Sequence, residues 1–190
     1  MKNKKLIIIG AIILAVIIII AVIAGGYNGL VEKEETVNEK YAEIQTQLQR
    51  RADLIPNFVA TVKGYSDYEK ETYTAVTEAR SAVAKASNAT ELADANEKLN
   101  GAISVWVNAV TEAYPELKAN QNYVALQDEL AGTENRIAKS RDDYNEFTAD
   151  YNITIRKFPK SILAGIFGFD KKDLFKASEG AENVPQVSFN

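Results

Sequence analysis

The chain of 190 residues contains neither cysteine nor histidine. Without cysteine there is no disulfide and no thiol nucleophile, and without both residue types the usual ligands of a zinc site are missing. Histidine is also the commonest general base in enzymes, so its absence removes the most frequent form of acid–base catalysis. A domain without disulfides is tolerated on either side of a membrane, so these absences do not indicate a compartment.

Other signatures of catalysis are also missing. The sequence has no glycine-rich phosphate-binding loop and no credible grouping of serine, base and acid. Di-iron sites in helical bundles need histidine beside glutamate, and no loop has the pattern of an EF-hand. We therefore predict that the chain is not an enzyme and that it holds no cofactor and no metal. Solvated helix faces explain its many carboxylates.

Positive charge is scarce outside the N-terminal tip. The formal net charge is −4, and Lys2, Lys4 and Lys5 all lie in the first five residues. The remainder of the chain is therefore more acidic than the total indicates. An acidic domain without a basic stripe repels nucleic acid, so we predict no nucleic-acid partner.

Residues 6–24 form an uninterrupted apolar run, LIIIGAIILAVIIIIAVIA. As a helix this run is about 28 Å long, which matches a hydrocarbon core of about 30 Å. It exceeds the apolar core of a cleaved signal peptide, about 7–15 residues, although the small residues 24–26 would suit a peptidase. We predict a basic tip at residues 1–5 and a transmembrane helix at 6–24, which makes the chain a single-pass protein of the cell membrane with the lipid bilayer as a partner.

The side of the membrane is predicted from the lysines. Three of them precede the run, whereas only Lys33 and Lys40 follow it closely. The positive-inside rule then places the N-terminus in the cytoplasm and the following domain outside. The margin is small, so a cytoplasmic domain stays open.

Residues 27–159 repeat apolar side chains at intervals of three and four. Val37, Tyr41, Ile44 and Leu48 form one heptad-like seam, as in a coiled coil, and similar seams follow along the chain. Short connections between long helices force neighbouring helices to be antiparallel. The predicted fold class is all-α: an N-terminal transmembrane helix followed by an up-and-down four-helix bundle.

Turn and cap residues divide these seams. Asp53 is a candidate N-cap for a helix with Pro56 in its first turn, and we favour a break between helices there. The alternative is one kinked helix that continues through Pro56 and turns at residues 64–66. Further boundaries are predicted at residues 87–90, after Tyr114 and at Phe158, since Pro115 and Pro159 cannot continue a helix.

Four longer phrases resemble the bacterial LemA family. They are RRADLIPNFVATVKGY (50–65), AYPELKANQNYVALQDEL (113–130), TENRIAKSRDDYN (133–145) and YNITIRKFP (151–159). The resemblance extends from about residue 27 to the closing phrases FKASE and VPQVSFN. It implies a membrane helix and a helical bundle with no assigned molecular activity. It also implies an N-terminus outside the cell, which opposes the orientation derived from the lysines.

One polar cluster interrupts the apolar seams. Its members are Arg50, Arg51, Asp53 and Asn57 near Pro56, and Glu134, Asn135 and Arg141 on the last helix. Two guanidiniums could bind a small anion or a peptide at a bundle corner. Alternatively an arginine pairs with an acid such as Glu134 while Asp53 caps a helix. The polar residues of the last helix either fix the register of the bundle or line a cavity.

Residues 160–190 differ from the bundle. SILAGIFGF (161–169) is too short to span a bilayer, so it either packs against an open bundle end or enters the membrane interface. The tail from Lys176 to Asn190 could add to a sheet edge of a partner, lie along the bundle, or be disordered.

The leading functional hypothesis is a membrane-anchored helical scaffold that binds another membrane or envelope protein. It rests on the anchor, the bundle and the lack of residues suited to catalysis. The alternative is a membrane-anchored sensor that binds a small anion or metal between helices. A homo-oligomer formed through the apolar run is possible, but the run has no small-xxx-small pair strong enough to predict one.

Overall fold

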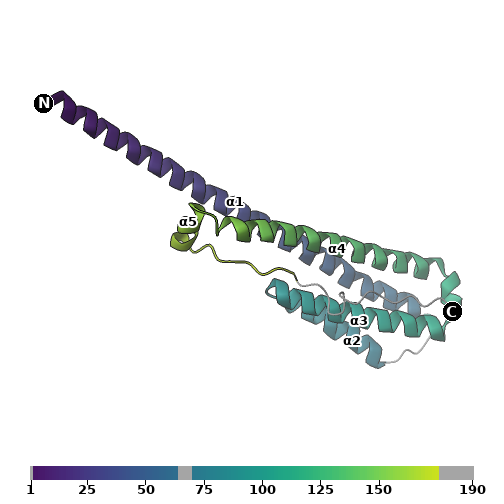
Figure 1. Cartoon of the computed structure of the whole chain (residues 1–190). Helices are drawn as coiled ribbons and strands as arrows, with labels where there is room; N and C mark the ends of the chain where they lie inside the picture. Colours follow the sequence, from purple (N-terminus) through teal and green to yellow (C-terminus); the bar gives the residue numbers. More distant parts are fainter. Residues whose placement is uncertain (1, 64–69, 176–190) are drawn as a thin grey trace, which may run out of the picture. The chain divides into compact units, whose positions relative to one another are not determined.

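The computed structural model describes residues 2–63 and 70–175, and every regular element within these ranges is a helix. The elements are α1 (Lys2–Lys63), α2 (Lys70–Lys85), α3 (Ala89–Ala113), the 3-10 helix η1 (Pro115–Ala119), α4 (Gln121–Thr154) and α5 (Lys160–Phe167) (Figure 1). The predicted all-α class, with a long apolar N-terminal helix and a helical bundle, is confirmed. The tail from Lys176 to Asn190 lies outside the described residues.

The chain divides into two compact units, which are described separately. The anchor unit comprises the described residues up to 39 together with 146–172. The bundle unit comprises residues 40–63, 70–145 and 173–175. Each of the long helices α1 and α4 contributes one portion to each unit.

The bundle unit contains four α-helical segments, one each from α1, α2, α3 and α4, and the short 3-10 helix η1. Figure 1 shows α2 and α3 side by side as a helical hairpin. Three aromatic rings join α1, α3 and α4: the ring centroid of Phe58 on α1 lies 4.8 Å from that of Trp106 on α3 and 5.0 Å from that of Tyr123 on α4. Such pairs add about 0.5–1.5 kcal/mol each to the free energy gained by burial. The buried residues of the predicted seams in this unit include Ile44, Leu48, Val76, Val83, Leu92, Leu99, Ile103, Val110, Leu130 and Ile137.

The favoured break near Pro56 is wrong, because α1 continues through this residue to Lys63. Proline inside a helix removes one backbone hydrogen bond and costs about 3 kcal/mol. Ile55 and Phe58 on either side are almost completely buried, and their burial offsets that cost. The alternative of one helix through Pro56 therefore describes α1, while its proposed turn at residues 64–66 lies outside the described residues.

The boundaries of α3 lie where the sequence predicts them. Asn88 is the N-cap, and its side-chain oxygen accepts a 2.9 Å hydrogen bond from the backbone N–H of Glu91. The Glu91 carboxylate in turn accepts from the backbone N–H and the hydroxyl of Ser87. The first of these bonds is the main reason that the pKa of Glu91 is lowered. At the other end α3 stops at Ala113, and Pro115 opens the 3-10 helix.

The anchor unit contains the apolar run of α1. Its large side chains from Leu6 to Ile23 are exposed, and among the described residues this is the one helix long and apolar enough to cross a membrane. Beyond the run, Leu30 and Tyr151 are buried. Lys33 pairs with Asp150 of α4, which joins the two long helices within the unit. The apolar helix indicates membrane anchoring.

The last helix of the predicted bundle ends earlier than expected. α4 stops at Thr154 rather than at Phe158, and two hydrogen bonds of 3.2 Å with 3-10 spacing tighten the chain after it. The residue before a proline is disfavoured in the helical conformation, which explains why Phe158 is not helical. Pro159 follows a cis peptide bond and precedes α5.

Candidate interaction site

Arg51 lies in the core of the bundle unit with only 6% of its surface exposed. The buried residues Leu48, Arg51, Ile55 and Phe58 follow at intervals of three, four and three, so the arginine occupies a seam position of α1. Its guanidinium pairs with the carboxylate of Glu134 on α4. Burial lowers the pKa of Arg51 to about 10, so the side chain stays charged at neutral pH.

Glu134 connects three helices of the bundle unit. One carboxylate oxygen accepts from Arg51 of α1, and the other accepts a 3.2 Å hydrogen bond from the side-chain amide of Asn100 on α3. A buried polar group is costly unless it is paired, so this layer favours one alignment of the three helices over shifted ones. The geometry agrees with a role in fixing the register.

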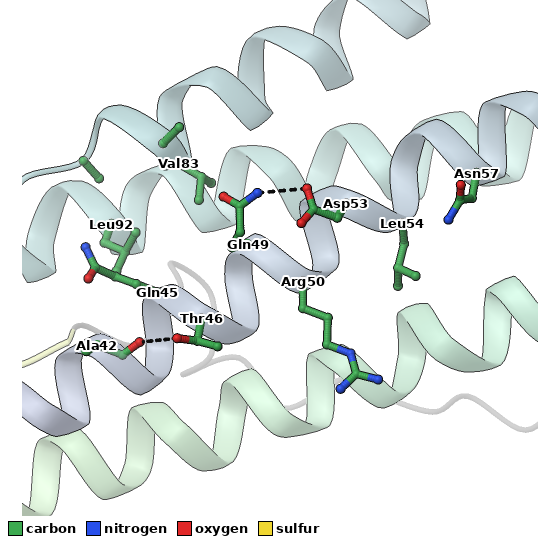
Figure 2. Close-up of a pocket in the computed structure, with 12 residues that line it drawn as sticks. Ala42, Gln45, Thr46, Gln49, Arg50, Asp53, Leu54, Asn57, Val83 and Leu92 are labelled. Atoms are coloured by element: carbon green, nitrogen blue, oxygen red, sulfur yellow. Dashed lines mark hydrogen bonds between the residues drawn. The ribbon is translucent and has the colours of Figure 1, made fainter.

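The other cluster residues on α1 face two different neighbours. Arg50 is exposed and pairs with Glu129 of α4 at 2.9 Å, and the same carboxylate oxygen accepts from Arg136 at 2.7 Å. Asp53 does not cap a helix, because it lies inside α1, which continues to Lys63. It accepts hydrogen bonds from Gln49 at 2.8 Å and from Arg80 of α2 at 3.1 Å. Figure 2 shows Asp53 beside Gln49, with Arg50 on the side of α1 that is directed toward α4.

Of the remaining predicted cluster members, two are exposed, and the last one, Arg141, contacts a different part of the chain. Asn57 and Asn135 are exposed on α1 and α4. Arg141 follows Glu134 by two helical turns, a rise of about 10 Å. Its guanidinium lies over the ring of Phe175 at 4.7 Å from the centroid, and burial lowers its pKa. The structure therefore does not bring Arg141 to the group around Arg51.

A shallow groove of about 770 Å³ lies beside this cluster in the bundle unit. A polar row of α1, with Gln45, Gln49, Asp53 and Asn57 at intervals of four residues, forms one wall. The apolar side chains of Val83 and Leu92 contribute to the lining from α2 and α3. Figure 2 shows these side chains around the groove. The groove thus combines side-chain amides with an apolar floor.

Sequence reasoning missed how α4 binds the extended segment 169–175. In the anchor unit, Asn152 donates to the carbonyl of Lys172 at 2.8 Å and accepts from its N–H at 2.9 Å. The hydroxyl of Tyr151 donates to the carbonyl of Asp170 at 3.0 Å. One asparagine thereby satisfies both backbone groups of one residue, as a neighbouring strand would.

The bundle unit repeats this arrangement with other residues. Asn145 donates to the carbonyl of Phe175 at 2.9 Å and accepts from its N–H at 2.7 Å. The hydroxyl of Tyr144 donates to the carbonyl of Asp173 at 2.8 Å. The signal in the sequence is a Tyr-Asn pair that recurs after seven residues.

No metal site emerges among the residues that the structure describes. In residues 2–63 and 70–175 no three carboxylates lie close enough together to hold an ion. The guanidiniums of Arg50 and Arg51 are paired with carboxylates, and that of Arg141 lies over an aromatic ring. The chemistry of the site is therefore that of side-chain amides and ion pairs on a helical surface.

Taken with the apolar helix, these features define a membrane-anchored, all-α bundle protein. The model of the LemA family matches residues 40–189, and the chain belongs to this family. The chain is also similar to the magnetosome protein MamQ 2 of Paramagnetospirillum magneticum, with 26% identity over an aligned length of 189 residues; the match covers 85% of this chain and 70% of the relative. Protein LemA of Metamycoplasma hominis is 26% identical over 162 residues, which cover 83% and 72% of the two chains.

Proposed function

We propose that the chain is a membrane-anchored interaction module whose bundle unit binds an extended segment of another membrane or envelope protein. The observation that carries the proposal is the groove of about 770 Å³ with its row of polar side chains on α1. Residues four apart on a helix are about 6 Å apart along its axis, and alternate residues of an extended chain are about 6.6 Å apart. Side-chain amides in such a row match the spacing of backbone groups on one edge of a strand.

The chain itself uses the same chemistry elsewhere. Asn145 and Asn152 each bind both backbone groups of one extended residue. The amides of Gln45, Gln49 and Asn57 have the same donors and acceptors, and they line an exposed groove rather than the core. Leu54 and Ala84, which also line the groove and keep exposed surface, would contact apolar side chains of the bound segment, which gives selectivity to backbone recognition.

The proposal includes the side of the membrane. Three lysines precede the apolar run, and the positive-inside rule then places the bundle unit outside the cytoplasm, facing envelope proteins. Because the chain has no cysteine, Ser87→Cys at an exposed position provides a single probe. Labelling of intact cells by a membrane-impermeant maleimide supports this side. Labelling that requires permeabilisation overturns it and makes cytoplasmic proteins the candidate partners.

Photo-crosslinking in native membranes tests the groove. A photoreactive amino acid at Gln49 or at Asn57 should give the same discrete product with a second protein. The same residue at Val105, which is 61% exposed on α3 and does not line the groove, should not give it. Gln45→Ala should weaken the product from Asn57 without changing the melting temperature, because Gln45 is exposed. Identical products from Val105, or no product from the groove positions, would contradict the proposal.

The sensor of a small anion or metal is the second hypothesis from the sequence. It requires Arg50, Arg51 and Arg141 to converge on one ligand. The first two are engaged by separate carboxylates and the third by an aromatic ring. No specific observation favours this function, so we do not propose it.

A further inference from the structure

α5 carries an apolar surface that the anchor unit leaves uncovered. Ile162 and Ile166 are 54% and 68% exposed, and their spacing of four places them on one face of the helix. Phe158, in the turn before α5, is 82% exposed. A soluble protein rarely exposes several large apolar side chains so close together, and such a patch marks an interaction surface.

A neighbouring side of α5 packs closely against α1. Ala164 is buried, and a Cβ atom at Gly26 would lie 2.5 Å from Cδ1 of Leu163. Glycine at this position leaves room for the side chain of Leu163 against α1. The aromatic ring of Tyr27 adds an edge contact, 4.8 Å between centroids, with Phe167. α5 is thus fixed at the point where the apolar run of α1 ends.

This point defines the depth of α5 in a membrane. Val22 and Ile23 of α1 line the same hollow of about 480 Å³ as Ile162 and Ile166 of α5. The run to Ala24 is about 28 Å long and nearly fills a hydrocarbon core of about 30 Å, so its last turn lies at the edge of that core. Side chains that share a hollow with this turn lie at the same depth.

The charges around α5 fit a phospholipid headgroup layer. Residues 156–172 include the acid Asp170 and five basic residues, Arg156, Lys157, Lys160, Lys171 and Lys172, in a chain whose net charge is −4. Lys172 pairs with Glu34 of α1 at 2.9 Å, so the positive excess beside α5 comes from the other four. Basic side chains beside an apolar surface bind anionic phosphates while their stems stay in the apolar layer. A second copy docked through this same face would bring two positive patches together, so the excess of positive charge favours an anionic lipid surface.

We propose that α5 is an interfacial helix and forms a second lipid contact of the chain. Ile162 and Ile166, with Phe158 before them, enter the outer edge of the hydrocarbon, and Lys157 and Lys160 lie among anionic phospholipid headgroups. This contact holds α1 at two points and limits its rotation about the membrane normal. The inference does not depend on the groove of the bundle unit.

Site-specific fluorescence in vesicles tests the contact. Full-length Ile166→Cys carries an environment-sensitive fluorophore in vesicles of phosphatidylcholine and anionic phosphatidylglycerol. Nitroxide lipids labelled near the headgroup or near the chain end serve as quenchers. Ile12→Cys, in the middle of the run, provides a hydrocarbon control. Glu39→Cys provides an aqueous control, since it follows Gly26 on α1 by about 20 Å. Fluorescence of Trp106, the single tryptophan, checks the fold before labelling.

The proposal predicts a distinct pattern for the three probes. The Ile166 probe should emit at shorter wavelength than the Glu39 probe, and the shallow nitroxide should quench it about twofold more than the deep one. The Ile12 probe should show the reverse preference. Lys157→Glu with Lys160→Glu should reduce the quenching of the Ile166 probe in anionic vesicles to the value in phosphatidylcholine alone.

Three outcomes would overturn the inference. The first is an Ile166 probe that behaves like the Glu39 probe. The second is shielding at Ile166 that nitroxide lipids do not quench and that disappears on dilution with lipid, which would identify a second copy as the cover. The third is quenching that charge reversal leaves unchanged, which would remove the headgroup contact.

Discussion

Asn152 holds the backbone of Lys172 through two hydrogen bonds, and we expect Asn152→Ala to release it. Asn152 is only 9% exposed, and its side-chain amide bonds both the carbonyl and the N–H of Lys172. A hydrogen bond within a protein contributes about 1 kcal/mol net, so the loss of both should lower the free energy of local opening by about 2 kcal/mol. Since 1.4 kcal/mol corresponds to a factor of ten, exchange of the Lys172 amide hydrogen should accelerate about 30-fold.

Amide hydrogen exchange of the full-length protein in lipid nanodiscs measures this effect directly. The matched control is Asn135→Ala on the same helix, where the asparagine is exposed and the exchange at Lys172 should not change. Asn145→Ala should accelerate exchange at Phe175, because the Phe175 N–H donates a hydrogen bond to the side chain of Asn145. Exchange at Lys172 should not change in this variant. Exchange at Lys172 that stays within about threefold of wild type in Asn152→Ala would refute the reasoning, since side-chain packing would then hold the segment without the amide.

Three further predictions concern stability. Pro56→Ala should raise the free energy of unfolding by about 1–3 kcal/mol in a denaturant titration, because alanine restores the missing hydrogen bond to Ala52; no gain would mean that α1 is adapted to the proline. Glu134→Ala should lower the free energy of unfolding by about 2 kcal/mol, since Arg51 stays buried without its partner. The double variant Arg51→Met with Glu134→Gln should recover most of this loss. Equal losses in the single and the double variant would contradict the pairing. Burial raises the pKa of Tyr151 to about 12. The buried neutral hydroxyl therefore contributes fully to stability below the unfolded pKa of about 10, and this contribution disappears as the pH rises toward 12. A Tyr151→Phe variant should lose this pH dependence in thermal melts.

The fold was predictable because its signals are periodic. Apolar residues at intervals of three and four mark the buried faces: in the first predicted seam Val37, Ile44 and Leu48 are buried, and Tyr41 is half-buried. The boundary at Asn88 was predictable because a cap needs only neighbouring residues. The path through Pro56 was not, since it depends on tertiary burial of Ile55 and Phe58, which outweighs a local helix breaker.

The cluster was predictable in part. Arg51 occupies a seam position, and an arginine there must reach an acid on a facing helix, which the structure places at Glu134. The residues around Arg50 and Asp53 in the sequence do not indicate that Arg50 pairs with α4 and Asp53 with α2. The rotation of α1 about its axis decides which helix each side chain contacts, and that rotation depends on tertiary packing. Arg141 could not be excluded from the cluster either, since its contact, Phe175, is distant in sequence.

The Tyr-Asn repeat shows what a better sequence criterion would use. Seven helical residues rise about 10.5 Å, and three extended residues advance about 10 Å. A Tyr-Asn pair that recurs every seven residues on a helix can therefore bind the backbone of an extended chain at every third residue. Asn152 and Asn145 bind Lys172 and Phe175 in this way. Side chains that bind only backbone groups place no demand on the sequence they bind. The repeat is consequently visible in α4 alone, and asparagines at heptad spacing beside core tyrosines predict an extended segment of unspecified sequence on that helix.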